Sequence, residues 1–315
     1  MTASNLHNLP IAVDAMGGDR APESVVAGAC AAVRQGAHVV LMGDEALLSP
    51  LISQESLGDL GSLRVQHTDQ AVGMDEAPLA SLRDKPRASI TRALESVEQG
   101  LTSGAVSFGN SGAVLLEAVR TLRLLPGVDR PALAVQLPTR TGSSVVLLDV
   151  GANVDAKADQ LVGFAQLGVA WARCGGISHP TVGVLSNGEE RRKGNQLVRD
   201  ALDLLEKDGF PASPVEPGPM MDGQCDVVVC DGFVGNVLIK GMEAAADLLR
   251  PGVTAPSAVP GRPDAALLLG VRGLVLAGHG ASDPAIIART VLYASKVASD
   301  QVLARFASEL TRASG

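Results

Sequence analysis

Continuous apolar runs, each ending in an aspartate and a glycine-containing turn, occur three times along this chain. The middle run, Ser143 to Asp155 (SSVVLLDVGANVD), surrounds Asp149 with five apolar residues. A continuous β-branched run of this kind is typical of a strand buried on both faces of a parallel sheet. Ile11 to Asp19 (IAVDAMGGD) and Val227 to Asn236 (VVVCDGFVGN) repeat the design. Because ligands bind beyond the carboxyl ends of such strands, the three turns predict one shared site.

Between these runs, strand-like and helix-like periods alternate. Helices are expected over residues 22–34, 44–51, 90–100, 114–124, 161–174, 241–250 and 285–308, and strands over residues 37–43, 63–67 and 181–185. Two proline-containing stretches, residues 73–89 and 209–223, are expected to be loops. The alternation predicts an α/β fold with a doubly wound, mostly parallel sheet and flanking helices. We expect residues 1–315 to form a single interlocked domain. This domain could consist of two lobes with the site in the cleft between them.

Composition excludes several functional classes. The net charge is -8 and aromatic residues make up 2% of the 315 residues, which disfavours nucleic acid as a partner because phosphate backbones attract cations and single strands need stacking faces. No apolar run approaches the ~18 residues that a membrane span requires, and the N-terminus lacks a signal-peptide pattern, so we expect a cytoplasmic protein. Four cysteines without ligand spacing predict reduced thiols and no metal site.

Small residues and cations mark candidate anion-binding turns. Glycines after the first strand and before the helix from residue 114 let backbone N–H groups approach an anion, and a helix N-terminus favours one. The candidate substrate- and phosphate-binding residues are Asp14, Gly17, Gly18, Arg83, Lys85, Gly109, Asn110, Ser111, Gly112, Asp149 and Asp231. Each aspartate taken alone is equally consistent with helix capping. No Walker A or GxGxxG pattern is present, so a nucleotide is not indicated.

Four polar residues are candidates for the chemistry itself. Asn153 and Asn236 follow two of the apolar runs, and His279 lies in the glycine-rich turn of LVLAGHGAS. Lys193 ends the charged run GEERRK, which is otherwise typical of a solvated segment. Amide and imidazole donors can stabilise an oxyanion, and a lysine can neutralise phosphate. The catalytic candidates are therefore Asn153, Lys193, Asn236 and His279.

The ordered segments IAVDAMGGD, FGNSGA, RPALAVQLP, LLDVGANVD, GEERRKGN, DVVVCDGFVGN and LGVRGLVLAGHGAS resemble the phosphate acyltransferase (PlsX) family of bacterial phospholipid synthesis. The resemblance covers almost the whole chain. It implies transfer of a fatty acyl group from acyl carrier protein to inorganic phosphate, yielding acyl phosphate. It also implies a homodimer, a fold similar to isocitrate and isopropylmalate dehydrogenases, no metal and no cofactor.

Two departures from the family pattern leave alternatives open. Val215 to Met220 (VEPGPM) replaces the usual VEGRDI, so a non-catalytic relative that binds acyl carrier protein is one alternative. Coenzyme A in place of the carrier protein is another, whereas a metal-dependent hydroxyacid dehydrogenase lacks a nicotinamide signature. The helical segment after DGFVGN is shortened to Gly241 to Arg250. We therefore expect weak or transient membrane contact, peripheral at the inner face of the membrane.

Overall fold

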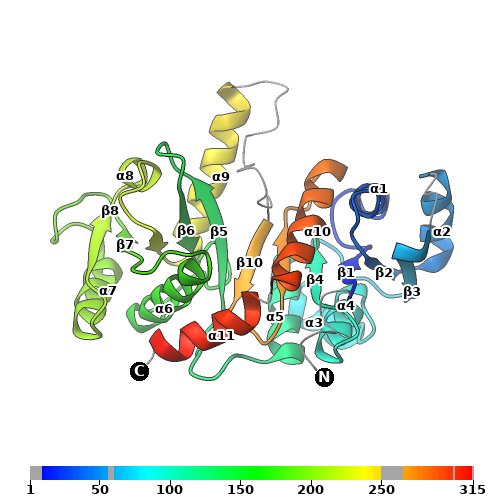
Figure 1. Cartoon of the computed structure of the whole chain (residues 1–315), viewed down its shortest axis with the longest axis horizontal. Helices are drawn as coiled ribbons and strands as arrows, with labels where there is room; N and C mark the ends of the chain where they lie inside the picture. The colour runs from blue at the N-terminus through cyan, green and yellow to red at the C-terminus, as the bar shows by residue number, and fades with distance from the viewer. Residues whose placement is uncertain (1–8, 56–59, 250–264, 301, 314–315) are drawn as a thin grey trace. The chain divides into compact units, whose positions relative to one another are not determined.

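The computed structural model of the chain describes residues 9–55, 60–249, 265–300 and 302–313 (Figure 1). The chain divides into two compact units. Unit 1 comprises residues 1–123 and 261–303, and unit 2 comprises residues 124–260 and 304–315. Each unit is therefore built from two separate segments of the chain. The expected single interlocked domain, with its site in a cleft, stays a prediction.

Unit 1 is a mostly parallel sheet with helices packed on it. Its strand order is β3-β2-β1-β4-β11-β10, in which β10 alone among the described strands of this unit runs antiparallel to its neighbour β11. The strands are β1 (Ile11–Asp14), β2 (Val39–Gly43), β3 (Leu63–His67), β4 (Gly104–Ser107), β10 (Ala265–Leu269) and β11 (Val275–Gly278). The helices are α1 (Glu23–Arg34), α2 (Glu45–Gln54), the 3-10 helix η2 (Leu60–Ser62), α3 (Pro78–Asp84), α4 (Ser89–Glu98), α5 (Ser111–Leu122) and α10 (Pro284–Ser299).

Unit 2 repeats this architecture. Its strand order is β5-β6-β9-β7-β8, with β5 and β6 forming an antiparallel hairpin and the other neighbours parallel. The strands are β5 (Ala132–Pro138), β6 (Ser144–Leu148), β7 (Val182–Leu185), β8 (Ala212–Val215) and β9 (Val227–Val229). The helices are α6 (Ala158–Cys174), α7 (Gln196–Lys207), α8 (Pro217–Met221), α9 (Gly232–Leu249) and α11 (Val302–Ala313), most of which falls in this unit.

The α/β class and the mostly parallel sheet are confirmed. The central strands are apolar because helices cover both faces, and β1, β6 and β9 are buried along almost their whole length. Side chains from β6 and β9 pack in one core with Met220 of α8. Parallel neighbours end at the same edge, so the polar turns that follow β1, β4 and β11 lie together in unit 1. Those following β6, β9 and β7 lie together in unit 2.

Several expected boundaries are wrong. The stretch 73–89 contains α3, and the stretch 209–223 contains β8 and α8; in both cases a proline occupies the first helical turn, where its missing N–H costs nothing. The hairpin strand β5 was not expected. The expected helix over residues 285–308 is two helices, because α10 ends at Ser299 before α11 begins at Val302.

Helix α9 is longer than the sequence indicates. It begins at Gly232 and not at Gly241, because Asp231 accepts a hydrogen bond from the Val234 N–H and so caps the helix early. In Figure 1 its later turns (yellow) extend away from the sheet of unit 2. Part of the expected segment, residue 250, lies outside the described residues.

A glycine permits the close packing of α1 on α10 in unit 1. A Cβ atom at Gly28 would lie 2.5 Å from Cβ of Ile287 and 2.8 Å from the Pro284 carbonyl oxygen. Neither neighbour is the free end of a flexible side chain. The two helix backbones approach this closely only because position 28 has no side chain.

Gly28→Ala is expected to lower the free energy of unfolding by about 1–3 kcal/mol, because added volume in a packed contact forces the helices apart. Gly163→Ala in α6 is the matched control, since a Cβ there meets nothing within 4 Å. That change should raise stability by about 0.5–1 kcal/mol through helix propensity. Urea unfolding followed by circular dichroism measures both, and a Gly28→Ala protein as stable as the parent would contradict the packing.

Candidate active site

The turns after β1, β4 and β11 come together at one edge of the unit 1 sheet. Of the three aspartate turns expected to share one site, the first lies in unit 1 and the other two lie in unit 2, so their shared site stays a prediction. The Asp19 N–H donates to the Gly280 carbonyl oxygen at 2.9 Å, which joins the turn after β1 to the turn after β11. A Cβ at Gly17 would lie 2.9 Å from the Gly109 nitrogen, so the turns after β1 and β4 are also in close approach. The structure thus brings Gly17, Gly18 and Gly109 together with the turn that carries His279.

Asp14 lies beneath these turns and faces the interior. It is 3% exposed and accepts hydrogen bonds from Ser107 Oγ at 2.6 Å and from the Met16 N–H at 3.3 Å. Ser107 Oγ in turn accepts from the Gly109 N–H at 3.1 Å. Burial raises the pKa of Asp14, and the hydrogen bond from Ser107 opposes that rise. These contacts favour a role in positioning the Gly109 backbone over direct contact with phosphate.

Asn110 organises the N-terminus of α5. Its Oδ1 accepts from the Ala113 N–H at 3.2 Å, and its Nδ2 donates to the carbonyl oxygens of Met74 and Glu76, both at 3.0 Å. Ser111 and Gly112 are the first two helical residues, and N–H groups at those positions have no intrahelical acceptor. Ser111 is exposed. The segment Gly109–Gly112, which we call the Asn110 turn, therefore has the small residues and donors of an anion site.

The two predicted cations of unit 1 have acidic neighbours. Lys85 Nζ lies 2.6 and 2.8 Å from the two carboxylate oxygens of Glu76 and 2.8 Å from the Ala71 carbonyl oxygen. Arg83 is largely exposed and contacts Asp84 at 3.1 Å. Glu76 therefore compensates the charge of Lys85. Direct contact between Lys85 and phosphate stays a prediction.

Asp149 is the centre of the unit 2 edge. It is 0% exposed and accepts five hydrogen bonds: from the N–H groups of Leu133, Gly151, Ala152 and Asn153 and from Asn153 Nδ2, at 2.6 to 3.3 Å. Burial raises the pKa of Asp149, and these donors oppose the rise because they favour the charged form. Its oxygens are occupied by the chain, so its contacts favour positioning the turn over binding substrate.

Asn153 and Asn236, the two amide residues of this edge, differ in whether their side-chain N–H groups already have acceptors. Asn153 Nδ2 donates both to the Pro131 carbonyl oxygen at 2.8 Å and to Asp149 at 2.9 Å, which uses both amide protons. Asp231 caps α9. Asn236 lies on the first turns of α9, with Nδ2 3.6 Å from where a Cβ on Gly151 would stand. Within the described part of the chain, the Asn236 amide has no hydrogen-bond partner.

The loop Ser186–Gly194, which we call the Lys193 loop, follows β7. Lys193 is exposed and has no ion-pair partner among the described residues. Its neighbour Arg191 contacts Asp203 at 3.2 Å and also pairs with Glu206. Ser186 Oγ is buried, and no group in the described ranges hydrogen-bonds to it. An uncommitted lysine and an unpaired hydroxyl in one loop are suited to an oxyanion.

The sequence patterns do not mark Ser186, Ser107, Glu76 or Ser282 as site residues. Ser282 Oγ, near exposed His279, is also buried without a partner in the described part of the chain. Serine and glutamate are common at turns, and nothing in their spacing marks burial or pairing. Only Ser107 has a signal in the sequence, because within AVSFGN it is the last residue of the strand β4 and directly precedes the turn.

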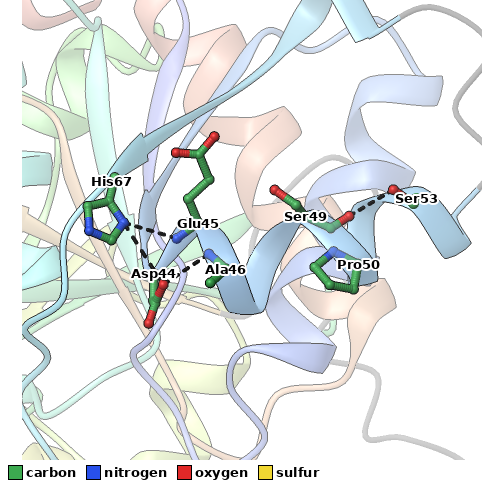
Figure 2. Close-up of a pocket in the computed structure, with 7 residues that line it drawn as sticks. All are labelled: Asp44, Glu45, Ala46, Ser49, Pro50, Ser53 and His67. Atoms are coloured by element: carbon green, nitrogen blue, oxygen red, sulfur yellow. Dashed lines mark hydrogen bonds and ion pairs between the residues drawn. The ribbon is translucent and has the colours of Figure 1, made fainter.

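A separate hollow of about 680 Å³ opens on α2 (Figure 2). In it, Asp44 caps α2 at Ala46 N, and His67 Nδ1 accepts from the Glu45 N–H at 3.2 Å. None of the predicted site residues lines this hollow. Its carboxylates would repel an anion, so it is not the phosphate site.

The described residues contain neither a metal-binding cluster nor a helix able to cross a membrane. Within those ranges, no group of three or more His, Cys, Asp or Glu side chains is placed to hold a metal ion. No described helix has both the length and the apolar character that crossing a membrane demands. The four cysteines are free thiols.

The sequence matches a family and curated proteins over most of its length. Residues 9–253 match a family described as fatty acid synthesis protein. A phosphate acyltransferase from Thermobifida fusca is 40% identical, with 96% of this chain and 90% of the relative covered. A phosphate acyltransferase from Pseudomonas syringae pv. syringae is also 40% identical, with 86% and 88% covered.

Solved structures share the fold at low identity. A phosphotransacetylase from Streptococcus pyogenes has a TM-score of 0.64 and 15% identity, covering 95% of this chain and 100% of that one. A 4-hydroxythreonine-4-phosphate dehydrogenase from Klebsiella pneumoniae has a TM-score of 0.58 and 12% identity, covering 93% and 98%. These similarities confirm the predicted fold class.

Asp149→Asn is expected to lower the free energy of unfolding by about 2–3 kcal/mol, because one acceptor oxygen becomes a donor facing buried N–H groups. Asp231→Asn is the matched control. Asparagine caps a helix as well as aspartate does, so the control should change stability by less than about 0.5 kcal/mol. Equal losses in urea unfolding would show that Asp149 is no more than a helix cap.

Proposed function

The chain belongs to the fatty acid synthesis protein family, with phosphate acyltransferases among its relatives, and from this premise we propose that it is a phosphate acyltransferase. It transfers a fatty acyl group from acyl carrier protein to inorganic phosphate. The observation that carries the proposal is 40% identity to a phosphate acyltransferase across 96% of the chain. The anion-binding character of two turns supports it independently.

The reaction requires little covalent chemistry from the protein. A phosphate oxygen attacks the thioester carbonyl carbon, the carbonyl oxygen becomes an oxyanion, and the carbon–sulfur bond then breaks. The electron pair leaves with sulfur, which takes a proton, so the products are acyl phosphate and the carrier thiol. Phosphate is already anionic at neutral pH. The protein therefore needs to hold phosphate beside the thioester and donate hydrogen bonds to the oxyanion, and this reaction uses no cofactor.

Each unit offers its own candidate hydrogen-bond donors for phosphate. In unit 1, the N-terminus of α5 at Ser111 and Gly112 offers backbone N–H groups to an anion. In unit 2, Lys193 offers a charge and Ser186 a hydroxyl. Binding of phosphate by the Asn110 turn and by Lys193 stays part of the proposal, and each is testable within its own unit.

Asn236 is our preferred oxyanion donor in unit 2. Its amide is uncommitted in the described part of the chain, whereas both amide protons of Asn153 already bind Pro131 and Asp149. We assign Asn153 a positioning role, since its carbonyl oxygen also accepts from the Gly232 N–H at 2.8 Å and so holds the start of α9. His279 remains a candidate donor in unit 1.

Three exposed apolar residues are neighbours of Asn236 or Asn153 along the chain. Val154 is 62% exposed, Phe233 60% and Val237 55%. Phe233 adjoins Gly232, which hydrogen-bonds to Asn153, and Val154 adjoins Asn153. Apolar groups gain free energy when they leave water together, so this surface suits a fatty acyl chain.

Two alternatives concern the carrier and turnover. Coenzyme A thioesters would serve the same chemistry, and a relative without turnover would only bind acyl carrier protein. Thiol release measured with long-chain acyl carrier protein and with acyl coenzyme A, each with and without phosphate, separates them. Release that needs both phosphate and the carrier protein supports the proposal. Equal thiol release from acyl coenzyme A would show that the enzyme does not require acyl carrier protein. No thiol release from either thioester would indicate a protein that only binds acyl carrier protein.

Lys193→Ala is expected to raise the KM for phosphate about tenfold with a smaller change in kcat, since a charge-assisted contact to the nucleophile is lost. Arg191→Ala in the same loop is the control, because Asp203 and Glu206 already neutralise that guanidinium. Its KM should stay within about twofold. A Lys193→Ala enzyme with unchanged KM would remove Lys193 from the site.

Self-association and membrane contact complete the proposal. We propose a homodimer, which sedimentation equilibrium measures directly. Membrane contact should be weak because partition scales with the apolar face buried, and α9 carries acidic Glu243 and small alanines between its larger apolar residues. Leu248, 80% exposed, is the main apolar side chain near its end.

Flotation with liposomes containing anionic lipid at physiological salt should recover only a small fraction of the protein. Leu248→Glu should change this fraction little, as should the control Leu79→Glu, which alters a leucine 76% exposed on α3. Strong flotation that Leu248→Glu abolishes and Leu79→Glu preserves would show that the end of α9 is an effective anchor.

A further inference from the structure

Residues 71–78, which come after β3 and end at the first residue of α3, lie against the Asn110 turn; we call this segment the strap. Asn110 Nδ2 donates to two strap carbonyl oxygens, those of Met74 and Glu76, both at 3.0 Å. A Cβ at Gly112 would lie 2.9 Å from Cγ of Pro78. The strap therefore touches both the capping residue and the second helical residue of the predicted anion site.

The strap also reaches the turn that follows β11. A Cβ at Gly280 would lie 2.6 Å from Cε of Met74. Close approach at Gly280 and hydrogen bonds at Asn110 set the strap against two of the three turns at this edge of unit 1. A displaced strap would leave the Asn110 amide without its acceptors, and the amide would be free to rotate away from the Ala113 N–H that it caps.

An ion pair between Lys85 and Glu76 also holds the strap. Lys85 Nζ bonds both carboxylate oxygens of Glu76 and also the Ala71 carbonyl oxygen at 2.8 Å. Glu76 is thus held at two points, by its carbonyl oxygen to Asn110 and by its carboxylate to Lys85. The hydrogen bond from Lys85 lowers the pKa of Glu76, so the carboxylate stays charged at neutral pH.

We propose that Lys85 and Glu76 are positioning residues that hold the strap, and through it Asn110 and the N-terminus of α5, in the geometry that binds phosphate. The inference rests on the proposed function. It gives Lys85 a role different from direct contact with phosphate, and it assigns a role to Glu76. Both side chains are about a third exposed, at 32% and 38%, so the pair adds little to global stability and acts on local order.

The two roles of Lys85 predict opposite effects of changing its partner. If Lys85 bound phosphate directly, Glu76→Gln would free its charge and leave the phosphate KM unchanged or lower. If the pair positions the strap, Glu76→Gln and Lys85→Met break the same contact. Each should then raise the phosphate KM about tenfold with a smaller effect on kcat, and the double variant should be no worse than either single one.

Arg92→Met is the matched control, because Arg92 pairs with Glu95 within α4 at 3.0 Å and both side chains are exposed to nearly the same extent as Lys85 and Glu76, at 37% and 34%. It should leave the KM unchanged. Unfolding midpoints equal to the parent's would show that all variants are folded. A raised KM for Lys85→Met with an unchanged or lowered KM for Glu76→Gln would overturn the inference.

Hydrogen–deuterium exchange gives a readout that needs no activity. Amide exchange in residues 71–81 should accelerate at least about tenfold in both Glu76→Gln and Lys85→Met, and not in Arg92→Met, because local opening follows loss of the contact. Unchanged exchange would overturn the inference even in an active enzyme. If the parent protein showed no phosphate-dependent thiol release, the proposed function would fail, and exchange alone would decide the role of the pair.

Discussion

The buried carboxylate of Asp149 is the constraint on which unit 2 depends. A charge without solvent is stable only when donors surround it, and the chain supplies five N–H groups from β5 and from the turn itself. Satisfying Asp149 fixes the turn, and the turn fixes Asn153. The Asn153 carbonyl oxygen then holds the Gly232 N–H, so the position of α9 follows from one carboxylate.

Unit 1 solves the same problem with fewer donors. Asp14 accepts from Ser107, and Ser107 accepts from the Gly109 N–H. In both units the carboxylate faces inward and orders a turn, so the apolar run ending in aspartate is a structural device. In the proposed function, the ordered turn leaves backbone N–H groups without intrahelical acceptors, as at Ser111 and Gly112, and these could bind an anion. The contacts of Asp14 and Asp149 therefore favour a role in ordering the turns, and direct contact of either carboxylate with phosphate stays a prediction.

The sequence predicts the large pattern well, because continuous apolar runs and helical spacing are consequences of burial. Strand β3 and the central turns follow from it directly. The expected loops at Pro78 and Pro217 are wrong because each of these prolines begins a helix and does not end one. The pairing of Lys85 with Glu76 was not predictable, since the residues are nine apart across a turn and a helix. Whether a charged side chain of a site is paired or available to a ligand depends on such contacts, and the periodicity of the sequence does not reveal them.

Charge placement then limits how this acidic protein can hold an anion. With a net charge of -8, several of its cations are neutralised close by: Lys85 by Glu76, and Arg191 by Asp203 and Glu206. In the proposed site, Lys193, which has no ion pair in the described ranges, would supply one charge, and backbone N–H groups would supply the other donors. Hydrogen bonds act at short range and are screened by salt far less than a field of surface cations. The proposed recognition of phosphate therefore depends on the geometry of the turns, which the buried carboxylates order and which we infer the strap holds in place.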